Sequence, residues 1–237
     1  MHYKFIAPPL PSLRRWRDLY RKFPGNSALR VLEYEKIQSL QLAGNFLDVG
    51  GGENARYTSY LPQDLDLKSI NIDPDINPTY LLKPLEPFPI KDNVFSGAIC
   101  LNTLEHIYDV SFVLSEILRV LKPGGSVYIT VPFIFRIHGH PDDYMRATPS
   151  WWRETLSRTG FAAAELQPLI WGRYTAAGSI SGYRGLLPAR FQFHWSHIKD
   201  VLYARLMFMG KQTYEGRRGE RICAVAPGWF ITATKAK

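Results

Sequence analysis

The residues best suited to chemistry stand at the ends of short apolar runs. Leu47-Asp48-Val49-Gly50-Gly51-Gly52-Glu53-Asn54 places three glycines and an early carboxylate directly after an apolar stretch. Glycines let the backbone approach a ligand closely and aim amide groups at it, and the carboxylate can meet a positive group. A P-loop would need Gly-Lys-Ser/Thr here, and none follows. The turn therefore indicates a ligand site without identifying the ligand.

A second acid follows at a spacing typical of nucleoside binding. Ile70-Asn71-Ile72-Asp73 ends an apolar run in an acid 21 positions beyond Gly52. In a doubly wound α/β fold, an acid at this distance can accept both hydroxyl hydrogens of an adenosine ribose. A nicotinamide dinucleotide would satisfy the same geometry, so these two motifs alone leave the cofactor open.

Groups that could remove a proton follow two further apolar runs. An imidazole titrates near neutral pH, and adjacent carboxylates can orient it. Capping or packing is a slightly better explanation for His106, which follows Glu105. A functional role is the better explanation for the loop from His138 to Arg146, because a core would not need its polar groups. The predicted catalytic candidates are His106, His138, His140 and Asp143, with Asp142 and Tyr144 beside them.

These motifs need strands that end at one edge of a sheet. From residue 45, short apolar runs alternate with helical segments, which is typical of a parallel sheet with crossover helices. The predicted strands are 46–49, 69–72, 97–101, 126–131 and 161–169, with further strands in 221–234. The predicted helices are 12–23, 28–42, 55–61, 110–121 and 149–159. Because ligands bind outside the carboxyl ends of such strands, the motifs are expected to face one site.

Four segments in this order resemble the class I methyltransferases that depend on S-adenosylmethionine (SAM), especially the methyltransferase-11-like domain. LDVGGGEN is similar to the first family motif, with Asn54 in place of the third glycine, and INIDP to the second. FPIKDNVFSGAICLNTLEHI and LSEILRVLKPGGSVYITVP resemble the later strands and turns, so the resemblance covers about residues 40–135. Two features depart from the family: Ser96 replaces an acid, and only Glu86 could substitute for an absent adenine-contacting acid.

The resemblance implies a Rossmann-like class I methyltransferase fold: a mostly parallel, doubly wound sheet with an antiparallel last strand and an inserted lid. It implies SAM as the cofactor and no metal. The cofactor-binding residues that it implies are Asp48, Gly50, Gly51 and Gly52 beside the methionine and ribose, Asp73 and Pro74 at the ribose, and Asn102, Thr103 and Leu104 near the sulfonium. The segment HGHPDDYMRATPSWW also resembles methyltransferases of polysaccharide and lipid-glycan biosynthesis.

We expect one methyltransferase domain over 1–237. Its parts are N-terminal helices (1–43), a SAM-binding core (44–135), a substrate loop with the C-terminal half of the sheet (136–170), a lid insertion (171–220) and final strands (221–237). Ile198, Val201, Leu202, Leu206 and Met209 share a predicted helical face. A lid over the substrate cleft is the favoured interpretation of this helix, and a membrane-surface helix is the alternative.

Charge and cysteine content narrow the setting. Residues 41–135 carry 6 Lys and Arg against 11 Asp and Glu, whereas residues 1–40 carry 8 against 3 and residues 136–237 carry 15 against 7. An acidic centre suits a cationic cofactor. The basic ends could bind an anionic acceptor, a membrane surface or nucleic acid, and the alternative is that they are ordinary solvated surface. Two cysteines without zinc spacing indicate a reduced, cytoplasmic setting. No transmembrane segment is expected, and peripheral membrane contact stays open.

The expected activity is methyl transfer from SAM to oxygen or nitrogen of a small-molecule or glycan-like acceptor. A nucleic-acid (RNA) methyltransferase is less favoured, because the Asn/Asp-Pro-Pro-Tyr/Phe tetrapeptide is replaced by Leu101-Asn102-Thr103-Leu104. A catalytically silent SAM-binding scaffold is the other alternative. A nicotinamide-dependent oxidoreductase is disfavoured, because the G-x-G-x-x-G spacing is missing. The sequence leaves the acceptor, the general base and the oligomeric state open.

Overall fold

A single sheet of eight strands organises the molecule. The computed structural model describes residues 1–84, 86–139, 142–184 and 186–237. The strand order is β1-β7-β8-β6-β5-β2-β3-β4, and β8 runs antiparallel between β6 and β7 while the other pairs are parallel. This confirms the predicted sheet with its antiparallel last strand. The strands are β1 (His2–Phe5), β2 (Asn45–Val49), β3 (Asp66–Asn71), β4 (Tyr80–Leu81), β5 (Phe95–Leu101), β6 (Leu121–Pro132), β7 (Ala163–Leu169) and β8 (Gly228–Thr234).

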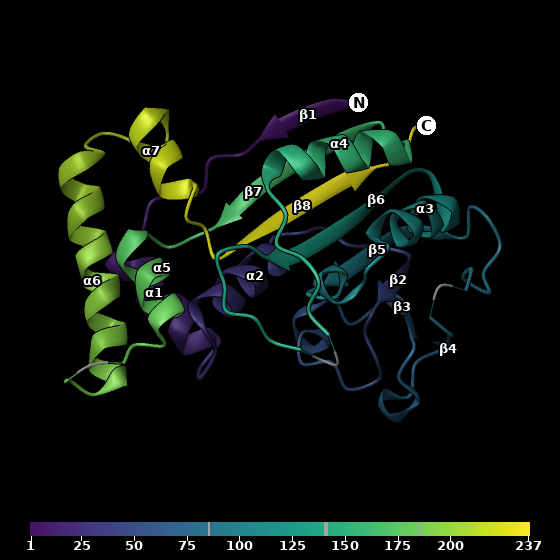
Figure 1. Cartoon of the computed structure of the whole chain (residues 1–237), viewed down its shortest axis with the longest axis horizontal. Helices are drawn as coiled ribbons and strands as arrows, with labels where there is room; N and C mark the ends of the chain where they lie inside the picture. The colour runs from purple at the N-terminus through teal and green to yellow at the C-terminus, as the bar shows by residue number, and fades with distance from the viewer. Residues whose placement is uncertain (85, 140–141, 185) are drawn as a thin grey trace.

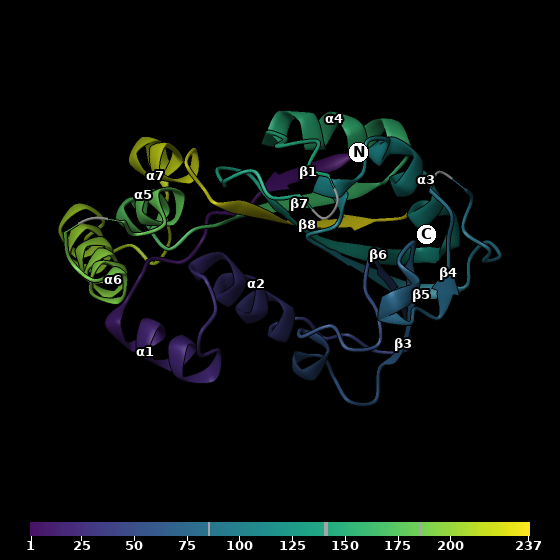
Figure 2. The same cartoon turned by 60° about the horizontal axis from the view of Figure 1, so that its bottom comes forward.

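Helices cover both faces of the sheet (Figures 1 and 2). The helices are α1 (Leu13–Lys22), α2 (Ala28–Gln38), α3 (Val110–Val120), α4 (Pro149–Thr159), α5 (Arg173–Ser181), α6 (Ala189–Met207) and α7 (Gly216–Cys223), with 3₁₀ turns η1 (Thr58–Tyr60), η2 (Pro74–Ile76) and η3 (Leu104–His106). One apolar core includes Ile117 of α3 and Trp152 of α4, and a second includes Tyr34 and Ile37 of α2. The sheet is therefore buried between two helical layers.

Local capping signals explain why several helices begin and end where the sequence predicts. The Thr148 hydroxyl caps α4, Pro149 occupies its first turn, and Gly160 ends it with a φ of 105° that favours glycine. Ser12 and Ser27 cap α1 and α2 in the same way. Such side chains satisfy amide groups that have no partner inside the helix.

Three predicted elements are wrong. Residues 55–61 form no α-helix and contain only η1, where the hydroxyls of Thr58 and Ser59 donate to the carbonyls of Ala55 and Arg56. Such local bonds compete with helix formation, and Pro62 follows directly. The apolar run at 222–225, predicted to be a strand, lies at the end of α7 and directly after it. The prediction failed because a short apolar run does not distinguish a strand from a helix. Helix α2 ends at Gln38, before the predicted Leu42.

The N-terminus also departs from the prediction. Residues 2–5 form the edge strand β1, paired in parallel with β7, where the sequence predicts only helices.

The segment between β7 and β8 folds into three helices. Helices α5, α6 and α7 gather with α1 at one end of the molecule, opposite β3 and β4 (Figures 1 and 2). We call these four helices the helical end. The Tyr20 hydroxyl lies 3.2 Å from His197 Nε2, and His197 Nδ1 lies 2.8 Å from the Phe193 carbonyl, so Nδ1 is the donor and Nε2 the acceptor. Burial lowers the pKa of His197 to about 4, so this contact between α1 and α6 uses a neutral imidazole.

A buried carboxylate joins α5 to α6. Asp200 of α6 accepts hydrogen bonds from the backbone amides of Tyr174 (2.9 Å) and Thr175 (2.8 Å), which begin α5. Asp200→Ala should reduce the free energy of unfolding by about 1–2 kcal/mol, because amides at the start of α5 lose their acceptor. Chemical denaturation measures this change. Glu220→Ala removes an exposed acid from α7 and serves as the control. Equal stability of Asp200→Ala and wild type would contradict this role.

Candidate cofactor and acceptor site

The glycine turn after β2 packs directly against the residues that follow β5. Gly50 has a φ of 91°, and a Cβ atom there would lie 2.2 Å from Thr103 Oγ1. A Cβ atom on Gly51 would lie 1.9 Å from an oxygen of Asp48. Glycine is therefore required at both positions by close approach, and at Gly50 also by its backbone conformation. The structure brings two of the predicted motifs together at the carboxyl edge of the sheet.

Asn71 at the end of β3 joins the glycine turn to Asp73. Its side-chain amide donates to the Gly50 carbonyl at 2.7 Å, and its carbonyl oxygen accepts from the Asp73 amide at 3.0 Å. The Asp73 carboxylate is half-buried and accepts from the Asp75 amide at 2.9 Å, while Pro74 begins η2. Asp73 thus lies at the turn after β3, close to the glycine turn. Asn71 belongs to the second motif, but its spacing does not mark it as a site residue.

A buried glutamate from α2 closes the edge beside β5 and β6. Glu33 is fully buried and receives hydrogen bonds from Arg30 Nη1 (2.7 Å), the Thr130 hydroxyl (2.8 Å) and the amide of Asn102. Asn102 itself has a left-handed backbone, with a φ of 50°. The Asn102 amide, predicted to line the cofactor, is therefore directed to Glu33 and Thr130. This network fixes α2 against the ends of two central strands.

Two further carboxyl groups at this edge are buried without a cation. Asp48 and Glu105 are each 1% exposed. The Tyr57 hydroxyl donates to one Asp48 oxygen at 2.6 Å, while the other Asp48 oxygen and both Glu105 oxygens have no hydrogen-bond partner among the described residues. Burial raises the pKa of each carboxyl to about 7. At Glu105, the positive charges of Arg146 and Arg30 lower the pKa but do not cancel the effect of burial. Asp48 and Glu105 also both raise the pKa of the buried Cys100 thiol, so each carboxyl lies near that group.

The structure brings His106 and His138 together, with ring centres 5.3 Å apart. His106 Nδ1 bonds to the Asp142 carbonyl, and His106 Nε2 lies 3.8 Å from a Glu105 oxygen. His138 Nδ1 lies 3.4 Å from Asp143, whose carboxylate also receives the His138 backbone amide at 2.8 Å. The predicted histidines therefore share one patch. His140, the fourth candidate, lies outside the described residues.

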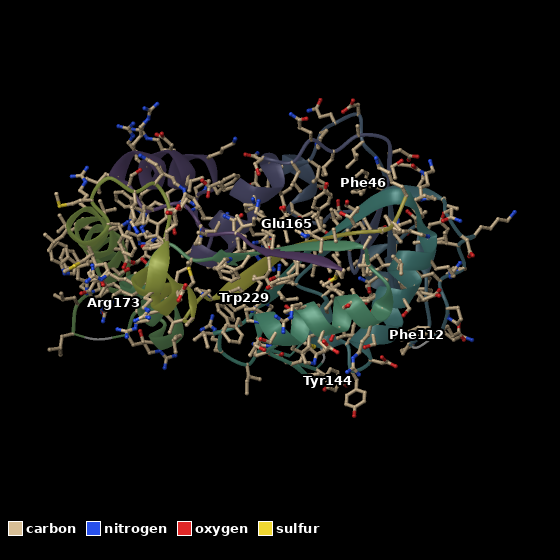
Figure 3. The ribbon with its side chains drawn as sticks, turned by 90° about the horizontal axis from the view of Figure 1, so that it is seen from above. Phe46, Phe112, Tyr144, Glu165, Arg173 and Trp229 are labelled. Carbon is tan, nitrogen blue, oxygen red and sulfur yellow. The ribbon has the colours of Figure 1, made fainter. Side chains whose placement is uncertain are left out.

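Arg146 fixes the charge state of Asp143. Its guanidinium donates to both Asp143 oxygens, and these bonds lower the pKa of Asp143 to about 2. Asp143 is thus ionised at neutral pH and can orient His138, but it is a poor proton acceptor itself. Neighbouring Tyr144 lies at the outer edge of the molecule (Figure 3) and is 51% exposed.

The same group could offer ligands to a metal ion. Atoms of Glu105, His106 and His138 lie within 4.8 Å of one another. However, Arg146 Nη2 lies 3.4 Å from His138 Nδ1 and places a fixed positive charge beside the group. That charge opposes further positive charge at His138 and so disfavours a metal ion there.

A cavity of about 440 Å³ opens beside the glycine turn. Asp48, Gly52 and Glu53 line it on one side, and Leu67 and Ser69 of β3 line it on another. These β3 side chains are uncovered where the predicted helix 55–61 is missing. Asp73 and residues 102–104 do not line this cavity, and the Leu104 side chain is fully buried in the core.

The missing acid at Ser96 lies away from the site. Ser96 is the second residue of β5, and its hydroxyl donates to the Asn45 side chain at 2.8 Å, at the amino edge of the sheet. Its departure from the family pattern therefore removes no group from the glycine turn. Glu86 is exposed and lies 3.7 Å from Lys83, so its part in adenine binding stays a prediction.

Comparison with known proteins agrees with this geometry. Residues 47–129 match a protein family described as a methyltransferase domain. This part of the chain therefore resembles a methyltransferase domain, and the sheet that it contributes to has the Rossmann-like class I fold. The match begins within β2 and ends within β6, so it includes the glycine turn, Asp73 and the His106 turn. A search of curated proteins found no match to this chain.

Solved structures share the fold of this chain at low sequence identity. Phosphoethanolamine N-methyltransferase 2 of Haemonchus contortus, solved with phosphomonomethylethanolamine and S-adenosylhomocysteine, is 16% identical with a TM-score of 0.53. The match covers 93% of this chain and 57% of that enzyme, so the chain spans little more than half of its length.

Two further structures match along nearly their whole length. A SAM-dependent methyltransferase of Thermotoga maritima is 15% identical with a TM-score of 0.51, and the match covers 94% of each chain. The [4+2]-cyclase SpnF is 16% identical with a TM-score of 0.51, and the match covers 98% of this chain and 99% of that chain. Because a cyclase shares the fold, the fold alone does not set the reaction or the acceptor.

The buried Asp48 carboxyl predicts an unusual pH dependence of stability. The ordinary pKa of an aspartate is 3.8, whereas the pKa of Asp48 in the fold is about 7, so the folded protein binds more protons between these values. Stability is therefore lost as the pH rises from about 4 to 7. Asp48→Asn removes the buried charge and should raise the melting temperature of the ligand-free protein at pH 8, with a smaller gain at pH 5.

Differential scanning calorimetry at both pH values measures this effect. Asp66→Asn is the control, because the Asp66 side chain is 61% exposed and its charge stays hydrated. An Asp48→Asn variant that is less stable than wild type at pH 8 would contradict the assignment.

Proposed function

We propose that the chain transfers a methyl group from SAM to an oxygen or nitrogen of a small-molecule or glycan-like acceptor. One observation carries the proposal: Asp48 and Glu105 are buried beside the glycine turn, and among the described residues neither forms an ion pair with lysine or arginine. Both lie within residues 47–129, which match the methyltransferase domain. A buried carboxylate without a partner is costly, and a cationic ligand removes that cost. The residues present therefore suit SAM, which carries an ammonium and a sulfonium.

Each part of the site has a proposed role. When bound, SAM supplies an already activated methyl group. Asp48 and Glu105 offer negative charge, Gly50 to Gly52 allow close backbone approach, and Asp73 accepts from ribose hydroxyls. Catalysis then consists mainly of holding the acceptor in line and removing its proton.

His138 is the proposed proton acceptor. Asp143 lies 3.4 Å from His138 Nδ1, so a proton on Nδ1 leaves Nε2 free to accept one from a substrate. His106 Nδ1 is occupied by the Asp142 carbonyl, which leaves its Nε2 free in the same way. Since Asp143 stays ionised beside Arg146, its carboxylate can orient the His138 ring through Nδ1. His106 then positions the acceptor or shares the proton.

The acceptor class rests on the segment 138–152, which resembles that of methyltransferases of glycan biosynthesis. A nucleic-acid acceptor is less well supported. Basic side chains are concentrated in the helical end, which lies at the opposite end of the molecule from β3 (Figure 2). The phosphate contacts that nucleic-acid binding requires would therefore lie away from the turn after β3.

Calorimetric titration with SAM and with S-adenosylhomocysteine tests the cofactor site. We expect micromolar binding of both, and Asp73→Ala should weaken it at least about tenfold because two ribose hydroxyls lose a charged acceptor. Asp75→Ala removes an exposed acid from the same turn and should bind normally. Absence of binding by folded wild-type protein would refute the proposed function.

A turnover assay tests the proposed base. On an acceptor found by screening sugar nucleotides and glycolipid precursors, His138→Ala should lower kcat by about 10²–10⁴ and leave SAM affinity unchanged. His2→Ala, in the exposed edge strand, should change neither quantity. Unchanged kcat in His138→Ala would exclude His138 as the base. SAM binding without turnover on any acceptor would favour a catalytically silent scaffold.

A further inference from the structure

Helix α6 exposes a stripe of large apolar side chains, although it also buries Val201 and Ala204. Phe191, Trp195, Leu202, Leu206 and Met209, at and just beyond the helix, are 53%, 47%, 56%, 68% and 79% exposed. Their spacings of four, seven, four and three residues place them on one stripe of a helix. We call this stripe the α6 outer face. Helix α6 lies at the edge of the molecule in both cartoon views (Figures 1 and 2).

The inner side of α6 carries polar groups that are already satisfied. Ser196, His197 and Asp200 are buried there beside Val201 and Ala204, and each of the three has hydrogen bonds to the backbone. An amphipathic helix normally buries most of its large apolar side chains, so the exposure of the α6 outer face is unusual. The orientation is fixed by the cap that Asp200 forms on α5 and by the contact of His197 with Tyr20. Because these bonds hold the polar side inward, the apolar side faces outward.

Neighbouring segments also expose apolar side chains. Leu186 and Leu187, which precede the helix, and Ile180 of α5 are 107%, 54% and 49% exposed. Large exposed apolar side chains in this number mark a candidate interaction site.

The charge around the outer face identifies the occupant. Segments 13–22 and 173–223 carry 14 Lys and Arg against 4 Asp and Glu, whereas the rest of the chain carries 15 against 17. Exposed Arg184, Arg190, Arg205 and Lys211 lie along the segment, and none of them forms an ion pair among the described residues. Arg173 lies at the same end (Figure 3). A second copy of the chain would bring two strongly basic faces together, so the partner must be anionic.

We propose that the helical end docks on an anionic lipid bilayer, with the α6 outer face in the boundary between headgroups and acyl chains. Apolar side chains flanked by arginine and lysine are the composition of interfacial helices. The basic groups would meet lipid phosphates, and the aliphatic side chains would leave water. Within the described residues, no helix has the length and apolar character to cross a membrane. The proposal does not depend on methyl transfer.

Vesicle co-sedimentation of the full chain tests the proposal. Wild type should bind vesicles of mixed phosphatidylcholine and phosphatidylglycerol, with little binding to phosphatidylcholine alone, and salt should weaken the binding. Leu202→Glu combined with Leu206→Glu should reduce the partition coefficient at least about tenfold, because two exposed leucines are replaced by acids. Leu81→Glu is the matched control, because Leu81 is 57% exposed at the other end of the molecule.

Three results would overturn the proposal. One is absence of binding to the anionic vesicles. Another is an equal loss of vesicle binding in the α6 variant and in Leu81→Glu. That result would show that the added negative charge weakens binding wherever it is placed, and that the α6 outer face has no special part. The third is concentration-dependent dimerisation that the α6 variant abolishes without any vesicle binding, which would make the face an interface between copies. Circular dichroism and SAM titration of each variant show whether the fold and the cofactor site are intact. A loss of vesicle binding is therefore distinguished from a loss of SAM binding, which would contradict the proposed function.

Discussion

The site depends on one electrostatic constraint: the carboxyl groups of Asp48 and Glu105 are buried, and among the described residues neither forms an ion pair with lysine or arginine. Arg30 neutralises Glu33 at 2.7 Å, but Asp48 has only the Tyr57 hydroxyl and Glu105 has no bonded partner among the described residues. Desolvation of a carboxylate costs several kcal/mol unless a partner compensates it. Each group must therefore hold a proton or meet a positive ligand. Cofactor binding, the pH and the stability of the fold are therefore linked through the protonation of these two carboxyl groups.

The fold explains why such a costly arrangement is retained. Parallel strands β2, β3, β5 and β6 end at one edge, so residues far apart in sequence meet there without long loops. Helix α2 brings Glu33 to the same edge, and the loop after β6 brings His138 beside His106. The cofactor side is built on strand ends and a tight glycine turn. The acceptor side is built on the loop after β6, whose polar contacts fix His138 and Asp143 together.

The sequence predicted the features that depend on local patterns. Strand ends, the glycine turn and the α4 boundaries follow from apolar periodicity and capping residues, and the fold class follows from their order. The predicted helix 55–61 failed because the Thr58 and Ser59 hydroxyls compete for backbone carbonyls. The strand β1 was missed because its pairing with β7 joins residues about 160 positions apart.

The missed site residues share one cause. Glu33 lies among buried Val31, Leu32 and Tyr34. A charged residue within such an apolar helical segment is a signal that could have identified it, because charged side chains are rarely buried without a partner. Tyr57 and Asn71 act through contacts with Asp48 and Gly50, which spacing along the chain does not reveal. The burial of Glu105 likewise depends on the tertiary fold. The outward apolar face of α6 could not be predicted either, because periodicity shows that a stripe exists but not which way it faces.

The central claim is that a cationic cofactor ionises Asp48 and Glu105. Isothermal titration calorimetry of SAM binding in buffers of different ionisation enthalpy, from pH 6 to 8, measures the protons released. Because both pKa values are about 7, a positive ligand should lower them, so binding near pH 7 should release protons and tighten as the pH rises. Binding without proton release, at an affinity independent of pH, would contradict the account.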